Sequence, residues 1–271
     1  MISFPNCKIN LGLQIEGKRS DGFHAISSIM YPLPFEEILE IVEISGSGNC
    51  EFESSGLNIP GDKASNLCVK AYELLNKIYG LPSVHIHLHK IIPMGGGLGG
   101  GSSDAAETIK SLNTIFDLKL TTGQMKSYAS QLGSDCPFFI ENTPQLAKGR
   151  GEILTPINLS LKGYKIALVN DGTHINTKNA YAGVTPKEPD FKLDRLTSLP
   201  IEEWKNHLVN DFEESVFKHS PHLRNIKEEL YNQGAVYAAM SGSGATIFGM
   251  FEGAPYLSSL KNYHLNKVVT L

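Results

Sequence analysis

Alternating apolar and polar residues predict a strand in the first half of the chain. In SVHIHLHKI, residues 83–91, Val84, Ile86 and Leu88 alternate with three histidines. Because successive side chains of a strand point to opposite faces, this pattern predicts a strand that is buried on one face. Apolar runs bounded by turn residues predict further strands at residues 8–16 and 38–44 and in YKIALVN, residues 164–170.

Apolar residues at helical spacing predict the helices. Between residues 67 and 78 they share one helical face, and Gly80 and Pro82 follow as stop signals, so a helix is predicted over residues 65–79. The same reasoning predicts helices after the glycine-rich run to about Phe116, before Gly133, and near residues 201–217 and 221–233.

The order of these elements favours an α+β fold. Strands alternate with helices only loosely, which argues against a doubly wound parallel sheet. In AVYAAMSGSGATIFGMF, residues 235–251, two strands, or a strand and a helix, flank a tight Gly/Ser loop. TPKEPDFKLD, from Thr185, is polar and interrupted by proline, as in an exposed connection. With 271 residues, 41% of them hydrophobic, the chain can form one large domain or two lobes.

Composition and charge point to a small-molecule partner. The net charge is −4 without a block of like charges, so we expect neither nucleic-acid nor membrane binding. We also expect no signal peptide, because the N-terminus lacks a basic region followed by a long apolar one. We expect no membrane span, because no stretch reaches about 18 uninterrupted apolar residues. The four cysteines are widely spaced, which argues against a disulfide framework or structural zinc and fits a reducing, cytoplasmic location.

The run PMGGGLGGGSSDAAETI, residues 93–109, contains the main candidate binding site. Its six glycines precede a helix predicted to begin near Ser102 or Ser103. The first N–H groups of a helix attract anions, and glycines let further backbone N–H groups approach a phosphate closely. A flexible turn is the alternative, but six glycines are costly to order. The run therefore predicts a phosphate-binding loop.

Two common phosphate loops fit this run poorly. Gly95-x-Gly97-x-x-Gly100 matches the dinucleotide-binding pattern, but Pro93 interrupts the preceding strand and Asp117 lies at a helix end, where it is a doubtful ribose ligand. A Walker A loop requires a lysine that this run lacks.

The run resembles the second motif of the GHMP kinases, whose loop surrounds the phosphates of ATP. Three further segments are similar to motifs of one branch of this family, in the same order, so that the resemblance extends from residue 5 to residue 251. They are FPNCKINLGLQIEGKRSDGFH (4–24), LGSDCPFFI (132–140) and MSGSGATIFGMF (240–251). Two positions depart from the pattern: Cys7 replaces the usual alanine, and Phe23 replaces the commoner tyrosine of DGYH.

The resemblance implies a fold and an activity. The fold is a two-lobed α+β kinase, with an N-terminal ATP-binding domain of mixed sheet and helices (1–148), a C-terminal α/β-plait-like domain (149–271) and the active site in the cleft between them. The activity is transfer of the γ-phosphate of ATP, with Mg²⁺, to the 2-hydroxyl of 4-diphosphocytidyl-2-C-methyl-D-erythritol in the non-mevalonate pathway of isoprenoid biosynthesis. The enzyme would be a monomer or a weak homodimer.

Two charged residues within apolar segments are the candidate catalytic groups. Lys8 interrupts CKINLGL, and Asp135 precedes CPFF, which reads as an apolar strand. Taken alone they could form a structural salt bridge, since ion pairs also occupy such sites. The resemblance implies that Asp135 accepts the substrate's hydroxyl proton, while Lys8 keeps that carboxylate ionised and contacts the developing charge.

The resemblance also implies the nucleotide contacts. Ser65 and Asn66 occupy the place of the adenine pocket, although they could simply cap the first helix. Ser103 could ligate Mg²⁺ or serve as a helix N-cap. The loop that binds the phosphates comprises Pro93, Met94, Gly95, Gly96, Gly97, Leu98, Gly99, Gly100, Gly101, Ser102 and Ser103.

Substrate contacts are predicted in both halves of the chain. Phe23 and His24 offer a ring face and a hydrogen-bonding imidazole for cytosine, although Phe23 could instead be buried in the core. THINTKNAY resembles the segment that supplies the other side of the cytosine site, which implies Thr177 and Tyr181. Asn10 shares a strand face with Lys8 and could hold the polyol end of the substrate.

Two further features have simple interpretations, and two rival functions remain. His85, His87 and His89 share a strand face, and a solvated face is favoured over a metal site. SGSGAT, residues 241–246, could close on the active site or form a tight turn. The rivals are a kinase for another alcohol, such as homoserine or mevalonate, and a catalytically silent nucleotide-binding regulator, although the presence of both Lys8 and Asp135 argues against the regulator.

Overall fold

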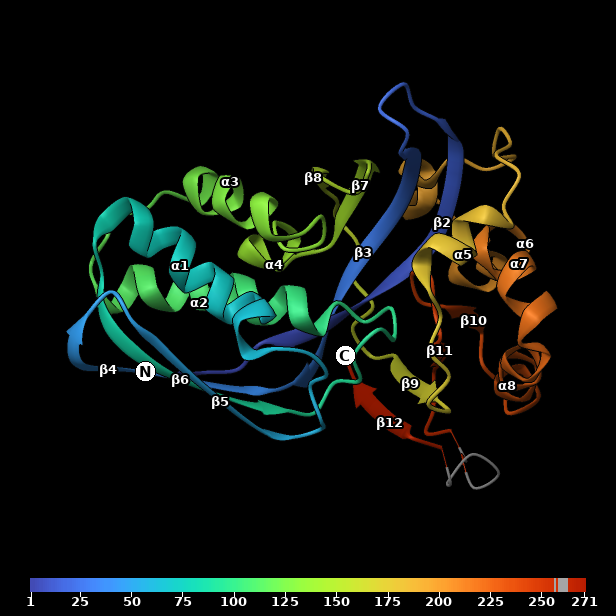
Figure 1. Ribbon diagram of the computed structural model, residues 1–271. Helices are drawn as coiled ribbons and strands as arrows, with labels where there is room; N and C mark the ends of the chain where they lie inside the picture. Colours follow the sequence, from blue (N-terminus) through green and yellow to red (C-terminus); the bar gives the residue numbers. More distant parts are fainter. Residues whose placement is uncertain (256, 258–262) are drawn as a thin grey trace. The chain divides into compact units, whose positions relative to one another are not determined.

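Figure 1 shows the computed structural model, which describes residues 1–255, 257 and 263–271. The chain divides into two compact units, and each is described by itself. Unit 1 comprises Met1–Cys7, Phe35–Met94 and Gly99–Thr143, and unit 2 comprises Lys8–Pro34, Gly95–Leu98 and Pro144–Leu271.

Unit 1 contains a four-stranded mixed sheet. Its strands are, in spatial order, β1 (Ile2–Ser3), β4 (Ile38–Ser47), β6 (Pro82–Lys90) and β5 (Cys50–Gly56). β4 is antiparallel to both β1 and β6, whereas β5 is parallel to β6. Val84, Ile86 and Leu88 are buried, as the alternating pattern predicts.

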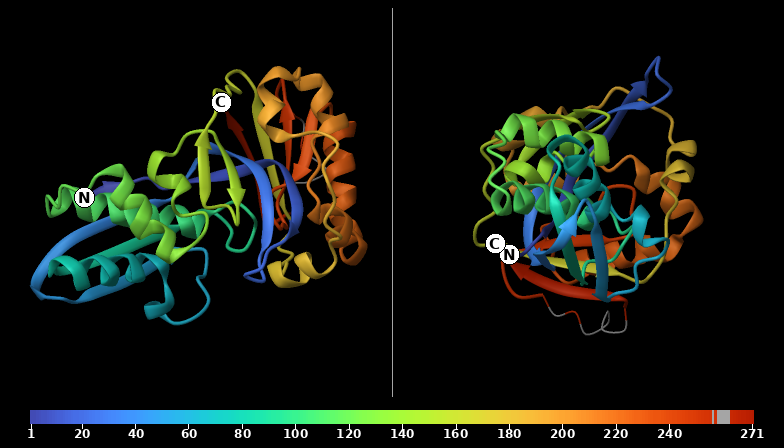
Figure 2. Two further views of the ribbon diagram at one scale, coloured as in Figure 1. Left: turned by 90° about the horizontal axis from the view of Figure 1, so that it is seen from above. Right: turned by 60° about the vertical axis from the view of Figure 1, so that its left-hand side comes forward.

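Helices cover one face of this sheet (Figures 1 and 2). α1 (Leu67–Tyr79) and α2 (Gly100–Ile115) lie on the sheet, whereas α3 (Thr122–Leu132) and α4 (Phe138–Glu141) pack on α2, and the short 3₁₀ helix η1 (Lys63–Ser65) precedes α1. α1 packs against β6 and α2 packs against β4. Asn66 caps the start of α1, and Gly80, at φ 62°, ends it in the left-handed conformation.

Unit 2 contains two more four-stranded sheets. The first has the order β2 (Asn6–Lys18), β3 (His24–Glu36), β7 (Gln145–Gly149) and β8 (Ile153–Pro156), and the terminal residues of β2 and β3 extend into unit 1. The second has the order β10 (Tyr237–Met240), β11 (Ile247–Phe251), β9 (Lys165–Asn170) and β12 (Leu265–Thr270), with every neighbouring pair antiparallel.

Unit 2 also contains helices. They are α5 (Thr177–Ala182), α6 (Trp204–His207), α7 (Phe212–His219) and α8 (Pro221–Asn232), with 3₁₀ helices η2 (Leu193–Ser198) and η3 (Ile201–Glu203). α8 packs on β10 and β11. A buried apolar cluster joins these layers and includes Leu13, Val169, Phe212, Ile226 and Ile247. No helix in the described part of the chain has both the length and the apolar character needed to cross a bilayer.

The α+β content is confirmed, but the helix predicted over residues 201–217 is wrong. The chain leaves the helical conformation between α6 and α7 because Leu13 binds it there. The Leu13 N–H donates to Val209 O at 2.9 Å, and the Asp211 N–H donates to Leu13 O at 2.8 Å. These bonds satisfy backbone groups that a continuous helix would pair internally.

Two other local predictions need correction, and one open alternative is decided. The helix predicted to begin near Ser102 or Ser103 begins at Gly100. Asp135 lies in a turn between α3 and α4, and the following apolar segment is a helix, not a strand. Of the two alternatives for residues 235–251, the structure has two antiparallel strands, β10 and β11.

Candidate active site

The glycine-rich loop leads into the N-terminus of α2. Gly99, at φ 72°, caps α2 without a side-chain hydrogen bond, and the Ser103 N–H donates to Gly99 O at 2.9 Å. The N–H groups that precede Ser103 in the first turn have no carbonyl partner within the helix, and the helix dipole adds partial positive charge there. The end of the loop therefore has the local structure of an anion site.

A second loop, Ser241–Thr246, lies against the middle of the glycine-rich loop within unit 2. The Ser241 hydroxyl donates to Gly97 O at 2.8 Å, and the Thr246 N–H donates to Gly96 O at 3.1 Å. Gly97 has φ 77°, and a Cβ added to it would lie 1.9 Å from Ser241 O. Only glycine allows the two backbones to approach this closely. The SGSGAT segment therefore supports the glycine-rich loop.

Lys8 and Asn10 lie beside the same loops. The Lys8 N–H donates to Leu98 O at 2.9 Å, and its Nζ donates to Gly97 O at 3.1 Å and to Asn10 Oδ1. Asn10 in turn donates from Nδ2 to Ser28 Oγ at 2.8 Å. Lys8 is only 3% exposed. A buried ammonium is thus fixed at the loop by neutral oxygen acceptors.

Asp135 belongs to unit 1, where its turn adjoins the first turn of α2. The neighbouring Cys136 thiol is buried and lies within hydrogen-bond reach of the Ser102 hydroxyl. Burial, together with the charge of Asp135, raises the pKa of Cys136 to about 12, although Ser102 opposes the shift. Asp135 is thus placed near the predicted phosphate site, whereas Lys8 belongs to unit 2.

A cavity of about 370 Å³ in unit 1 contains the predicted adenine residues. Ser65 and Asn66 line it together with Met94, Gly101 and Asp104. Both predicted residues also have local roles: the Ser65 hydroxyl donates to Asp62 O at 2.6 Å, and Asn66 Oδ1 accepts the Cys68 N–H at 2.8 Å. Met94, near the start of the glycine-rich loop, and Gly101, near its end, thus both line this cavity.

Phe23 is not a core residue. Its side chain is 54% exposed, and the guanidinium of Arg150 lies over its ring, 4.9 Å from the centroid. The Phe23 N–H donates to Asp21 Oδ1 at 3.1 Å, which orders the turn. An exposed, oriented ring can stack on a planar base.

His24, Thr177 and Tyr181 come together within unit 2, although they are far apart in the sequence. The rings of His24 and Tyr181 are stacked, with centroids 4.8 Å apart and planes inclined by 14°. Phe212 contacts Tyr181 edge-on at 4.8 Å. The hydroxyls of Thr177 and Ser243 are 3.1 Å apart, so α5 also contacts the second loop.

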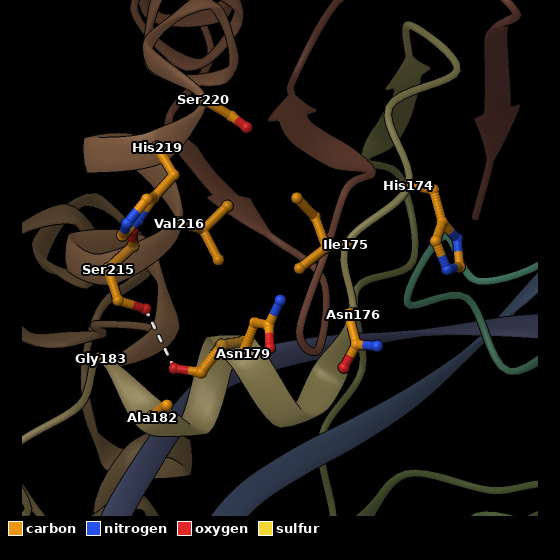
Figure 3. A pocket seen from close by; sticks show the side chains of 11 residues that line it. His174, Ile175, Asn176, Asn179, Ala182, Gly183, Ser215, Val216, His219 and Ser220 are labelled. Atoms are coloured by element: carbon orange, nitrogen blue, oxygen red, sulfur yellow. Dashed lines mark hydrogen bonds between the residues drawn. The ribbon is translucent and has the colours of Figure 1, made fainter.

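Helix α5 also borders a cavity that the sequence did not predict (Figure 3). The cavity has a volume of about 530 Å³, and α7 forms its opposite wall. The Ser215 hydroxyl donates to Ala180 O at 3.1 Å and joins the two helices. Thr177 and Tyr181 are not among its lining residues, which are His174, Ile175, Asn176, Asn179, Ala180, Ala182, Gly183, Ser215, Val216, His219 and Ser220.

The described ranges hold no preformed cluster of metal ligands. They contain no group of three His, Cys, Asp or Glu side chains arranged to hold a metal ion. Ser103 is 3% exposed and is not the N-cap of α2, because the helix starts three residues earlier. His85 lies 3.7 Å from Glu53, while His87 and His89 contact Ser55.

Several residues that shape these loops were missed from sequence. Asn210 is buried, and its Nδ2 donates to Met240 O at 2.7 Å and to Gly242 O at 2.8 Å, which holds the base of the second loop. Its short polar segment between two apolar runs was the available signal. Ser241 lies in SGSGAT, which the sequence singled out, whereas Arg150 gave no comparable signal because Phe23 is far away in the chain.

Comparison with known proteins agrees with this geometry. Residues 66–142 match the GHMP kinases N terminal domain, and residues 199–263 match the GHMP kinases C terminal domain. The crystal structure of a 4-(cytidine 5'-diphospho)-2C-methyl-D-erythritol kinase superposes with a TM-score of 0.86 at 27% identity, covering 99% of this chain and 98% of that one. The mevalonate kinase of Methanococcus jannaschii shares the fold, with a TM-score of 0.73, 14% identity and coverage of 100% and 98%.

Sequence relatives are closer. The 4-diphosphocytidyl-2-C-methyl-D-erythritol kinase of Cytophaga hutchinsonii is 51% identical, with 94% of each chain covered. The protein of the same name from Bacteroides fragilis is 49% identical and covers 93% of this chain and 92% of its own. The chain therefore belongs to the GHMP kinases and, within them, to the family of the 4-diphosphocytidyl-2-C-methyl-D-erythritol kinases.

Proposed function

We propose that this protein transfers the γ-phosphate of ATP to the 2-hydroxyl of 4-diphosphocytidyl-2-C-methyl-D-erythritol, a step in the non-mevalonate route to isoprenoid precursors. Membership of the family carries the proposal, since relatives with that name are about half identical over nearly the whole chain. The glycine-rich loop with the Lys8 ammonium bonded to Gly97 O supports it locally.

Lys8 and Asp135 are the proposed catalytic residues. Asp135 accepts the proton of the substrate hydroxyl as that oxygen attacks the γ-phosphorus, and ADP leaves on the opposite side. Lys8 stabilises the charge on the transferring group. The hydrogen bonds from Lys8 Nζ to Gly97 O and Asn10 Oδ1 fix the ammonium before substrates bind, so little reorganisation is needed.

The residues of the nucleotide site fit ATP. The cavity lined by Ser65 and Asn66 is large enough for a nucleobase, and it leads to the N–H groups at the start of α2. Mg²⁺ bound to the nucleotide would neutralise phosphate charge. Because the described residues contain no cluster of three metal-ligating side chains, we propose that phosphate oxygens and water hold most of its coordination sphere.

The cytosine site is proposed around Phe23, His24, Thr177 and Tyr181. The exposed ring of Phe23 and the stacked rings of His24 and Tyr181 provide flat surfaces for a base, and the imidazole adds a hydrogen-bonding group. Asn10, bonded to Lys8, holds the polyol end of the substrate. This arrangement would distinguish a cytidine-bearing alcohol from a small alcohol such as homoserine.

The proposal also covers domain organisation, location and partners. The two halves, 1–148 and 149–271, serve as an N-terminal ATP-binding domain and a C-terminal domain, which agrees with the separate family matches at 66–142 and 199–263. We propose a cytoplasmic monomer or weak homodimer that binds no nucleic acid, consistent with the net charge of −4.

A coupled assay of ADP release tests this function. The cytidine diphosphate substrate, homoserine and mevalonate are offered in parallel at equal concentrations with ATP and Mg²⁺. We expect turnover only with the cytidine substrate. Turnover with another alcohol would assign a different acceptor, and ATP binding without ADP release from any alcohol would indicate a silent regulator.

Replacing Phe23 tests the base site. In Phe23→Ala we expect the KM for the cytidine substrate to rise about tenfold, because a stacking surface worth about 1–3 kcal/mol is lost. The melting temperature should change little, because the ring is 54% exposed and its removal leaves no core cavity. An unchanged KM would contradict the assignment.

Ser103 is tested by metal titration. If its hydroxyl ligates Mg²⁺, Ser103→Ala should raise the Mg²⁺ concentration needed for half-maximal activity severalfold, with less change in the KM for ATP at saturating metal. Because Ser103 is 3% exposed and ordinary phosphate-bound Mg²⁺ keeps several waters, we expect no more than about a twofold change. A larger shift would make Ser103 a metal ligand.

A further inference from the structure

A buried charge network lies at the two ends of the glycine-rich loop in unit 1. It consists of Glu37, just before β4, Lys90, at the end of β6, and Asp104, in the first turns of α2. Their side chains are at most 4% exposed. Lys90 Nζ lies 2.7 Å from Glu37 Oε2 and 2.8 Å from Asp104 Oδ2. None of these residues belongs to the proposed catalytic pair.

Each end of the loop is attached to this network. Before the loop, Glu37 Oε1 accepts the N–H groups of Ile91 at 3.2 Å and of Ile92 at 2.6 Å. After the loop, Asp104 attaches α2 to Lys90. Gly100 packs directly on the ammonium, since an added Cβ would lie 3.1 Å from Lys90 Nζ. The network thus fixes both the entrance and the exit of the loop.

The network also contacts the nucleotide cavity. Lys90 and Asp104 both line it, and Lys90 O accepts the Leu57 N–H at 2.8 Å, which holds the chain leading to the cavity wall at residues 59–63. Burial opposes the charge of Lys90, but the two carboxylates outweigh it and raise its pKa. Burial, together with Glu37, raises the pKa of Asp104 well above its usual range, against the effect of Lys90.

Two observations argue that this network does more than stabilise the fold. Buried ion pairs contribute little net stability, because apolar residues of similar volume often stabilise equally well. Asp104 Oδ1 is moreover buried with no hydrogen-bond partner among the described residues, which adds a further cost. The glycine-rich loop lacks a lysine, so its phosphate affinity depends on how well its N–H groups are held in place.

We propose that Glu37, Lys90 and Asp104 are positioning residues for ATP: by fixing both ends of the glycine-rich loop they preorganise its N–H groups, and they set nucleotide affinity without touching the acceptor substrate. The proposal rests on the proposed function of the loop as the ATP site. It predicts that disrupting the network weakens ATP and ADP binding and leaves the KM for the cytidine substrate unchanged.

Three variants test this network. Asp104→Ala removes one partner of Lys90, whereas Asp104→Asn keeps an oxygen acceptor at the same place. Because Asp104→Ala could unfold the protein, the neutral triple variant Glu37→Gln/Lys90→Met/Asp104→Leu removes the charges together and keeps an amide oxygen at position 37 for the two N–H groups that precede the loop. The matched control is Lys126→Met/Glu141→Gln, which removes an ion pair on the surface of the same unit.

The readouts are the Kd for ADP by calorimetry, both KM values and the melting temperature. We expect the Kd for ADP and the KM for ATP to rise about tenfold in Asp104→Ala and in the triple variant, with Asp104→Asn and the control within about twofold of the parent. If the triple variant folds and binds ADP like the parent, the network is structural only. If the parent protein itself does not bind ADP, the proposed function fails instead.

Discussion

Asp135→Asn should lower kcat about a thousandfold while leaving the protein folded, because an amide cannot accept the hydroxyl proton that the carboxylate accepts. The substitution preserves size and shape, and Asp135 lies in a half-buried turn where an amide can be accommodated. The affinity for ADP should remain within about threefold of the parent, since the loop N–H groups proposed to bind phosphate are unaltered. Steady-state kinetics with ADP calorimetry separates the two effects.

The matched control for this variant is Asp117→Asn. Asp117 belongs to the same unit, but its side chain is 74% exposed and its ion pair with Lys119 is on the surface. We expect this control to leave kcat and the melting temperature unchanged. Near-normal kcat in Asp135→Asn would remove Asp135 from the chemistry, whereas loss of ADP binding along with kcat would indicate a folding defect of the turn.

The sequence was most informative where short-range pattern decides the structure. Strand β6 followed directly from the alternation of Val84, Ile86 and Leu88, because one face of a strand repeats every second residue. Helix α1 followed from one apolar stripe, with Gly80 as its end. The glycine-rich loop ahead of α2 could be predicted for the same reason, since its glycines and the following helix are contiguous.

Sequence reasoning failed where distant parts of the chain decide the local structure. The break between α6 and α7 is imposed by Leu13, which exchanges backbone hydrogen bonds with Val209 and Asp211. Helical propensity at residues 201–217 carries no information on this partner. The same holds for Asn210, whose side chain binds backbone carbonyls of the second loop.

The candidate site shows the same division. The resemblance pointed to Lys8, Phe23 and His24, each within one motif, but it did not reveal that Arg150 covers the ring of Phe23. The charge network was missed because Lys90 is 53 residues from Glu37 and 14 residues from Asp104. The available signal was Lys90 itself, a charged residue at a buried strand position. An ammonium buried there requires partners, so nearby carboxylates could have been expected.

Gly97→Ala should lower kcat/KM for ATP by about a hundredfold or more, because this glycine is where the two loops meet. A Cβ would lie 1.9 Å from Ser241 O, and the φ of 77° alone costs a non-glycine residue about 1–2 kcal/mol. The loops must therefore separate, and Gly97 O then loses its bonds from Lys8 Nζ and the Ser241 hydroxyl. In the control Gly17→Ala, where a Cβ meets no atom within 4 Å, kinetics and melting temperature should be unchanged. Near-normal kcat/KM in Gly97→Ala would show that this contact between loops is not needed for ATP binding or for the position of Lys8.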